Sequence, residues 1–268
     1  MAKKKKDKEK KARKGKAGVV YGLVMVILIV VSVVLACTVF FRVEEVEVEG
    51  NERYSAEQIL EVADVEQGAN LILTPGDQIA NRICKNLPYV DRVQVRKRFP
   101  TTIRLRITES QPVAVLPAAV VVTTEEGEET TAETGEFWII DAKGKLLEKA
   151  DESLALQYIS VTGLQVIDPA QGEIAQVPPV AQHRMENFLR LLQTLEDRGL
   201  VEKVTAIDAT LTTEISLVYD GRITGKLLSS SDFNRKLQIF EEIVALTGDY
   251  EYRTVNLKTD VAYDSPST

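Results

Sequence analysis

The chain of 268 residues has few of the side chains that commonly build metal sites, disulfides or catalytic centres. It holds two cysteines, Cys37 and Cys84, and a single histidine, His183. Cys37 falls within a long apolar run, so Cys84 is the only cysteine of the segment that follows and no disulfide can form within that segment. One histidine, with no cysteine pair at metal-ligand spacing, does not favour a zinc site. The fold must therefore be stabilised by burial of apolar side chains.

Motifs of common enzymes are also missing. The sequence has no Ser-x-x-Lys motif, no Gly-x-Ser-x-Gly elbow and no Walker phosphate loop. Acidic residues are plentiful, but Glu125, Glu126, Glu128 and Glu129 fall in a predicted loop, where nothing would bury a carboxyl group and raise its pKa. We therefore expect a protein that is not an enzyme and that takes no cofactor, metal or small-molecule substrate.

One uncharged run, Val19 to Phe41, divides the chain into a short basic tail and a long acidic body. As a helix this run would be roughly 34 Å long, enough to cross a hydrocarbon core of about 30 Å. It has no small-residue cleavage site of the kind that ends a secretory signal. The pattern predicts a retained transmembrane helix at residues 19–41.

The tail, residues 1–18, carries ten Lys or Arg residues against Asp7 and Glu9. Basic flanks stay on the cytoplasmic side, so the amino terminus is predicted inside and the segment from Arg42 onward outside the cell membrane. The net charge of the whole chain is −7, so the segment beyond the helix is more acidic still. An acidic body lacks the basic surface that nucleic-acid binding requires.

The first part of the ectodomain, residues 42–110, reads as strand, helix, helix and hairpin. Valines alternate with glutamates up to the turn at Gly50-Asn51, which predicts a strand. Ser55 and Gln58 form a capping-box pattern for a first helix, and Thr74-Pro75 opens a second helix that Pro88 ends. Two alternating segments on either side of Phe99-Pro100 predict the hairpin. This β-α-α-β-β order resembles a POTRA domain.

The predicted hairpin carries a basic cluster in an otherwise acidic ectodomain: Arg92, Arg96, Lys97, Arg98, Arg104 and Arg106. Two interpretations stay open. Alternating charge on the water face of a strand is ordinary solvation and protects sheet edges. The same charges would also suit lipid headgroups, an anionic wall polymer or an acidic partner.

The distal part, residues 111–263, is predicted to be a mixed β domain with two helices. Residues 123–136 are rich in Thr, Glu and Gly without apolar periodicity and are predicted to form a solvated loop. Asp220-Gly221 between two alternating segments is a strong hairpin signal. The predicted strands lie at 113–116, 137–140, 145–147, 158–161, 204–208, 214–219, 222–227 and 252–263, and the predicted helices lie at 180–198 and 232–246. Residues 264–268 are expected to be frayed.

These pieces, in this order, resemble the FtsQ/DivIB family of bacterial cell division proteins. The similar stretches are Val48-Glu49-Gly50-Asn51, then Arg98-Phe99-Pro100 leading to Glu109 and Pro112-Val113-Ala114, then Asp141 with Gly144, Gly163, Gly225 and Lys236-Leu237. The sequence departs from the family pattern at Phe99, where Trp is frequent, at Asn256, where Asp is frequent, and in the acidic segment 125–136.

The resemblance implies an α+β protein with one transmembrane helix that acts as a non-enzymatic division scaffold. In the family, such proteins hold FtsB (DivIC) and FtsL outside the membrane and help to regulate septal peptidoglycan synthesis at the division septum. A terminal strand at a sheet edge offers a physical route, because an extended partner segment can pair with its free N-H and C=O groups. By resemblance, the partner-binding residues are Asn256, Lys258, Thr259, Val261 and Tyr263. These residues could instead only close the sheet.

Two other functions stay open. A membrane-anchored cell-wall enzyme would act on peptidoglycan. A POTRA-type export or assembly chaperone would normally carry a β-barrel of alternating ten-residue segments, and no such series follows in this sequence.

Overall fold

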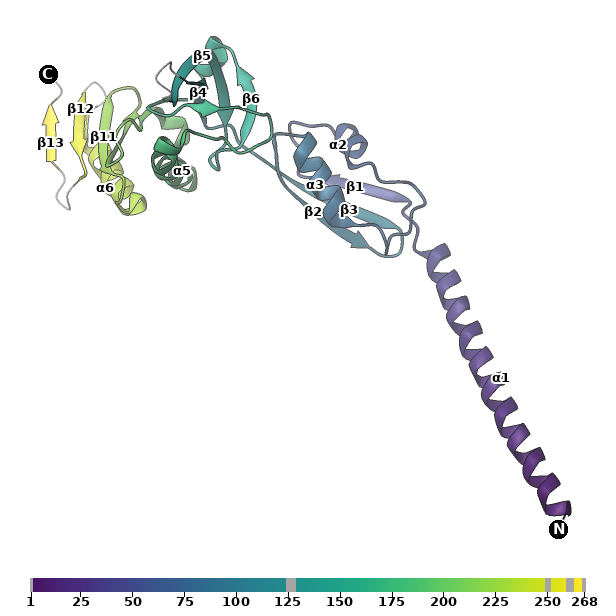
Figure 1. Cartoon of the computed structure of the whole chain (residues 1–268). Coiled ribbons are helices and arrows are strands. Elements are labelled where there is room, and N and C mark those ends of the chain that lie inside the picture. The colour runs from purple at the N-terminus through teal and green to yellow at the C-terminus, as the bar shows by residue number, and fades with distance from the viewer. Residues whose placement is uncertain (1, 124–128, 249–251, 259–262, 267–268) are drawn as a thin grey trace. The chain divides into compact units, whose positions relative to one another are not determined.

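The computed structural model describes residues 2–123, 129–248, 252–258 and 263–266 (Figure 1). The chain divides into two compact units, Met1–Ile83 with Val93–Ile107, and Cys84–Arg92 with Thr108–Thr268. The first unit holds a long helix and most of a small sheet with two helices, whereas the second holds a large sheet with helices of its own. The class is α+β, as the sequence predicted.

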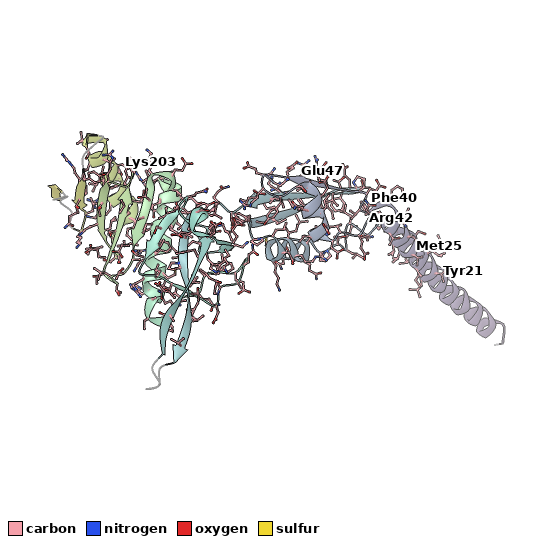
Figure 2. All side chains as sticks on the ribbon, turned by 90° about the horizontal axis from the view of Figure 1, so that it is seen from above. Tyr21, Met25, Phe40, Arg42, Glu47 and Lys203 are labelled. Atoms are coloured by element: carbon pink, nitrogen blue, oxygen red, sulfur yellow. The ribbon has the colours of Figure 1, made fainter. Side chains whose placement is uncertain are left out.

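The N-terminal helix α1 runs from Ala2 to Phe40, so the basic tail continues the apolar helix without a break. Its part from Tyr21 to Phe40, 20 residues with a mean hydropathy of 3.2, is long and apolar enough to cross a membrane. None of that part is buried within the protein. The side chains of Tyr21, Met25 and Phe40 project from the helix into open space (Figure 2). Outward-facing apolar side chains on every side are what a lipid-facing helix requires.

The elements that follow have the predicted order. Strand β1 (Glu45–Glu49) leads to helices α2 (Ala56–Ala63) and α3 (Gly76–Asn86), and strands β2 (Val90–Arg98) and β3 (Thr102–Glu109) form the hairpin. Residues 84–92, at the end of α3 and the start of β2, are assigned to the second unit. The strand order is β1-β3-β2, with β1 parallel to β3.

Local sequence explains how α2 starts and how β1 ends. The Ser55 hydroxyl accepts a hydrogen bond from the Gln58 amide, and the Gln58 side chain accepts one from the Ser55 amide, so the predicted capping box is present. Gly50 has a φ of +81°, and a Cβ there would lie 2.4 Å from the carbonyl oxygen of Ile107. Only glycine fits this turn, where β1 passes close to β3. The apolar faces then meet in a core that includes Ile59, Ile79, Ile83, Ile103 and Leu105.

The second unit is built on a ten-stranded sheet of order β13-β12-β11-β10-β9-β7-β4-β5-β6, with β8 paired to β4. Its strands are β4 (Ala114–Thr123), β5 (Glu129–Ile140), β6 (Leu146–Ala150), β7 (Ile159–Thr162), β8 (Val166–Ile167), β9 (Val204–Asp208), β10 (Glu214–Tyr219), β11 (Ile223–Leu228), β12 (Arg253–Asn256) and β13 (Tyr263–Pro266). Its helices are α4 (Glu152–Ala155), α5 (Gln182–Asp197) and α6 (Phe233–Leu246), with short 3-10 turns at Pro179–Ala181 and Val201–Lys203.

Helices α5 and α6 pack against the sheet and supply much of its core (Figure 1). Phe188 of α5 and Phe240 of α6 are fully buried. A Cβ on Gly225 of β11 would lie 3.0 Å from the Phe240 ring, so the glycine makes room for the aromatic side chain. The predicted β9-β10-β11 meander is antiparallel, and Asp220 and Gly221 at its second turn have φ values of 48° and 69°. Positive φ at both positions is the geometry of a two-residue hairpin turn.

Two predicted segments differ in the structure. Residues 129–136, expected in a solvated loop, belong to β5 and pair with β4, for example Ala132 with Val120 and Thr131 with Val121. The cross-strand partners, not a period within the segment itself, determine this strand. The predicted single strand 252–263 is two strands, β12 and β13, and Asp264–Pro266, expected to be frayed, lie in β13.

Candidate functional site

The candidate partner-binding residues lie at the C-terminal end of the ten-stranded sheet. Strand β12 runs parallel to β11, and the amides of Arg253 and Leu257 donate to the carbonyl oxygens of Arg222 and Lys226. Val255 and Leu257 are buried in the core. Since N-H groups alternate along a strand, the amides of Thr254 and Asn256 point away from β11.

The structure places three of the five predicted residues. The Asn256 side chain accepts a hydrogen bond from the Lys258 amide at 3.1 Å, which turns the chain after β12. The Lys258 ammonium group forms an ion pair with Glu214 of β10, so this lysine is engaged within the sheet. Tyr263 begins β13 and pairs with Asn256. Thr259 and Val261 lie outside the described residues.

Strand β13 occupies the outer edge of β12. It is antiparallel to β12, with Arg253 opposite Pro266 and Asn256 opposite Tyr263. In the described part of the chain no further strand pairs with β13, which is the last strand of the sheet. Residues 264–266 were not predicted as a strand, because Tyr-Asp-Ser-Pro contains few strand-forming residues and no apolar alternation.

The opposite end of the same sheet is closed. Strand β6 is the last strand there, and a loop covers it through backbone hydrogen bonds. The Leu146 amide donates to Glu173, the Gly172 amide donates to Leu146, and the Ala175 amide donates to Gly144. The Gln171 side chain adds a bond to the carbonyl oxygen of Leu147 at 2.9 Å. These bonds cover the start of β6, at Leu146 and Leu147, where the outer edge is engaged within the protein.

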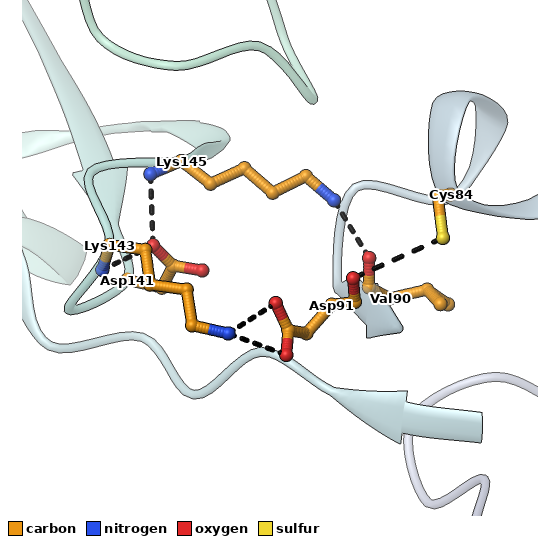
Figure 3. A network of polar contacts seen from close by, with 6 residues as sticks. All are labelled: Cys84, Val90, Asp91, Asp141, Lys143 and Lys145. Atoms are coloured by element: carbon orange, nitrogen blue, oxygen red, sulfur yellow. Dashed lines mark hydrogen bonds and ion pairs between the residues drawn. The ribbon is translucent and has the colours of Figure 1, made fainter. Parts of the chain in front are cut away.

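A turn before β6 holds a polar network (Figure 3). The buried Asp141 carboxylate accepts hydrogen bonds from the amides of Lys143 and Lys145, both at 2.9 Å. The Lys143 ammonium group contacts both carboxylate oxygens of Asp91 at 2.7 Å, and the Lys145 ammonium group donates to the carbonyl oxygen of Val90 at 2.8 Å. The network ties residues 90–91 to the β5-β6 turn within the second unit, and it fixes Asp141 and Lys143 in structural roles.

Two side chains near this turn have shifted pKa values. Burial away from water lowers the pKa of Lys145, although nearby acidic groups partly oppose the shift. Burial raises the pKa of Glu196, and the neighbouring Asp141 and Asp197 raise it further. Glu196, Asp141 and Asp91 line one small cavity of about 210 Å³ with Lys143. The described residues contain no group of three His, Cys, Asp or Glu side chains that could hold a metal ion.

A larger cavity of the second unit, about 740 Å³, is lined mainly by apolar residues. The polar side chains of its wall bond to other protein groups. Gln165 accepts from Thr131 and donates to Glu133, both at 2.9 Å, and Arg184 donates to the carbonyl oxygen of Thr210. Because these polar side chains are bonded to other protein groups, few of them are available to bind a ligand in the cavity.

Three arginines of the basic cluster on the β2-β3 hairpin lie near the glutamates of β1. Arg104 pairs with Glu47 at 2.8 Å and with Glu49 at 3.1 Å, while Arg98 and Arg106 lie 3.7 Å and 3.8 Å from the same two glutamates. Neutralisation on the surface of the sheet favours the solvation interpretation for these arginines. The charge pattern alone did not indicate that β1 lies beside β3 and runs parallel to it.

Comparisons with known proteins give one consistent result. Residues 41–110 match the family model described as "POTRA domain, FtsQ-type". Similar proteins include the cell division protein FtsQ of Geotalea daltonii, 26% identical over 82% of this chain and 74% of that protein. The cell division protein FtsQ of Geobacter sp. (strain M21) is 30% identical over 61% of this chain and 52% of that protein. The cell division protein DivIB of Clostridium acetobutylicum is 25% identical over 63% of this chain and 60% of that protein.

Proposed function

The chain belongs to the FtsQ/DivIB family of cell division proteins, and on that premise we propose that it is a membrane-anchored, non-enzymatic scaffold of the division machinery. Its amino terminus lies in the cytoplasm, and its two soluble regions lie outside the membrane at the division septum. There it binds FtsB/DivIC-type and FtsL-type proteins and helps to regulate septal peptidoglycan synthesis.

The observation that supports this proposal is the difference between the two ends of the large sheet. A loop covers β6, whereas β13 ends the sheet in the described part of the chain. An extended partner segment can add to an uncovered edge through backbone hydrogen bonds, while its alternate side chains set specificity. The C-terminal edge, which includes Asn256 and Tyr263, is the part of the second unit best suited to this mode.

We further propose that the partner segment pairs with β12 and takes the place of β13. Only four residues of β13 pair with β12. Its sequence, Tyr-Asp-Ser-Pro, is poor in strand-forming residues. A partner strand with β-branched residues would therefore compete well for the outward amides of Thr254 and Asn256.

Binding of the FtsB/DivIC-type ectodomain from the same organism tests this arrangement. The chain is compared, as the full-length protein in detergent, with Thr254→Pro, Thr254→Val and a chain ending after Lys258. Thr254→Pro removes an outward N-H and should weaken binding by about tenfold or more. Thr254→Val keeps the N-H and the side-chain size, so its affinity should stay near that of the unchanged chain.

The shortened chain separates the two ways in which the edge can be used. If the partner replaces β13, a chain ending after Lys258 should bind as tightly as the full chain or more tightly. Loss of binding on this truncation would mean that the partner pairs with β13 or with residues beyond 258. Charge substitutions at Thr259 and Val261 test the remaining predicted contacts. Unchanged binding by Thr254→Pro, with normal folding, would rule out β12.

Localisation and topology are tested separately. A fluorescent fusion should gather at the septum of dividing cells, and a reporter at Thr268 should be active only outside the cytoplasm. A cytoplasmic carboxyl terminus would contradict the proposed topology.

A further inference from the structure

The first unit exposes three large apolar side chains beyond α1, and all three lie at the end where the chain leaves that helix. Ile72, Leu73 and Phe99 are 47%, 78% and 61% exposed. In the described part of this unit between Arg42 and Ile107, no other large apolar side chain is exposed. Scattered single apolar residues are ordinary on protein surfaces, but a grouping at one end calls for an explanation.

Direct contacts bring these residues next to the end of α1. The rings of Phe41 and Phe99 meet edge to face, with centroids 5.6 Å apart. The Leu71 amide donates to the carbonyl oxygen of Phe41 at 2.8 Å, and the Lys97 ammonium group donates to the carbonyl oxygen of Ile72 at 2.9 Å. Phe41 directly follows Phe40, the last residue of α1. We call Phe41, Ile72, Leu73 and Phe99 the juxtamembrane patch.

The loop that carries Ile72 and Leu73 is held in a defined shape. Leu71 is fully buried, and the Asn70 side chain accepts hydrogen bonds from the amides of Ile72 and Leu73 at 2.9 Å and 3.3 Å. The Asn70 carbonyl oxygen accepts further bonds from Thr74. The two apolar side chains are therefore presented outward by an ordered turn, which reduces the entropy lost if they become buried.

Charged groups border the patch. Arg42 is exposed and its guanidinium group donates to the carbonyl oxygen of Thr38, while Arg98 is 59% exposed and Lys97 contacts the Ile72 loop. Two acidic residues, the exposed Glu44 and Glu45, are also close, since the amides of both donate to the carbonyl oxygen of Thr101. Aromatic and basic side chains beside an apolar surface are typical of segments that lie at a membrane interface.

We propose that the juxtamembrane patch inserts into the bilayer at the boundary between headgroups and acyl chains, and so seats the first unit on the membrane. The patch is continuous with the membrane helix, because Phe40 and Phe41 are adjacent in the chain and Phe41 contacts Phe99. This continuity indicates that the surface contacted by the patch is the bilayer. Ile72, Leu73 and Phe99 enter the interface, and Arg42, Lys97 and Arg98 face the headgroups. This role requires only a membrane-anchored chain and is independent of partner binding.

Tryptophan fluorescence in vesicles tests the proposal with the full chain. The chain has one tryptophan, Trp138 in the second unit, which supplies a constant background. Phe99→Trp and Leu73→Trp place new reporters in the patch, and Leu156→Trp is a matched control at a residue of the second unit that is 84% exposed. Val39→Trp, within the predicted span, confirms correct reconstitution.

Lipids carrying a quencher near the headgroup provide the readout. The two patch reporters should emit at shorter wavelength and be quenched at least about twofold more than Leu156→Trp, as expected for side chains that enter the outer 5–10 Å of the bilayer. Adding Leu73→Glu to Phe99→Trp should reduce the quenching toward the control value. Equal quenching of the patch reporters and Leu156→Trp would overturn the proposal.

Lipid composition separates apolar insertion from charge attraction. Vesicles of phosphatidylcholine alone should give most of the quenching, and added phosphatidylglycerol should increase it only modestly, because Glu44 offsets part of the basic charge. Quenching that appears only with phosphatidylglycerol would overturn insertion of the apolar side chains. Loss of partner capture in the binding experiment leaves all of these outcomes unchanged, so the two proposals fail separately.

Discussion

The two ends of the ten-stranded sheet are finished in different ways. At the β6 end, a loop bonds to the last strand and the buried Asp141 holds the preceding turn. At the β13 end, four paired residues of weak strand-forming sequence complete the sheet. Strand β6 has four residue pairs with β5 and additional bonds to a loop, whereas β13 has four residue pairs with β12 and no further strand beside it in the described part of the chain. An edge strand without additional contacts can be exchanged for another strand more readily. This contrast is the basis of our proposal that a partner pairs at the β13 end.

The largest expected effect on stability is at the β6 end of the sheet. Asp141→Ala removes the buried acceptor of two partly buried amide hydrogen bonds and should lower the free energy of unfolding by about 2–4 kcal/mol. Asp141→Asn keeps one oxygen acceptor and should cost roughly half as much. Urea unfolding followed by the fluorescence of Trp138, which pairs with Lys149 of β6, reports on this region. Equal losses for Asn and Ala would mean that the turn does not depend on the side-chain oxygen.

Smaller losses of stability are expected from proline substitutions at the two ends of the ten-stranded sheet, which can be compared directly. Ala175→Pro removes the amide that bonds to Gly144 at the closed end and should cost about 1–3 kcal/mol. Ser265→Pro, on β13, removes at most one ladder bond at the open end and should cost less than about 1 kcal/mol. Both are measured by the same urea unfolding. A loss for Ser265→Pro as large as that for Ala175→Pro would remove the distinction between the ends.

The smallest effect concerns pH. Burial raises the pKa of Glu196 above its unfolded value, so ionisation of this carboxyl opposes folding, and its contribution to stability is lost as pH rises through the folded pKa. Glu196→Gln should therefore stabilise the chain slightly at pH 7, by less than about 0.5 kcal/mol because the side chain is only partly shielded from water, and not below about pH 4. Glu202→Gln is a control at another exposed glutamate. A gain that persists unchanged at acid pH would point to a cause other than charge.

Much of the fold could be predicted because its signals are local. Ser55 and Gln58 are three residues apart and cap α2, Gly50 ends β1, and Asp220-Gly221 joins β10 to β11. Each of these features depends on a few neighbouring residues and their backbone preferences. The apolar periods of α5 and α6 were equally clear, and both helices lie within two residues of their predicted bounds.

The candidate site was harder to predict because strand edges depend on distant partners. Lys258, a predicted partner-binding residue, pairs with Glu214, which is 44 positions earlier in the chain. Residues 129–136 form a strand because β4 lies beside them, and β13 is a strand only through its pairing with β12. No pattern within either segment predicted these pairings. Short strands are not stable by themselves, so they depend on the partner strand beside them.

The sequence by itself determined a basic tail, one helix long and apolar enough to cross a membrane, a β-α-α-β-β unit and a β-rich region beyond it, because composition, caps, turns and apolar periods act over a few residues. Tertiary structure alone decided which sheet end is covered, that β13 occupies the edge of β12, and that Phe99, Ile72 and Leu73 gather beside Phe41. These outcomes depend on contacts between residues far apart in the chain, which form only when the backbone is folded.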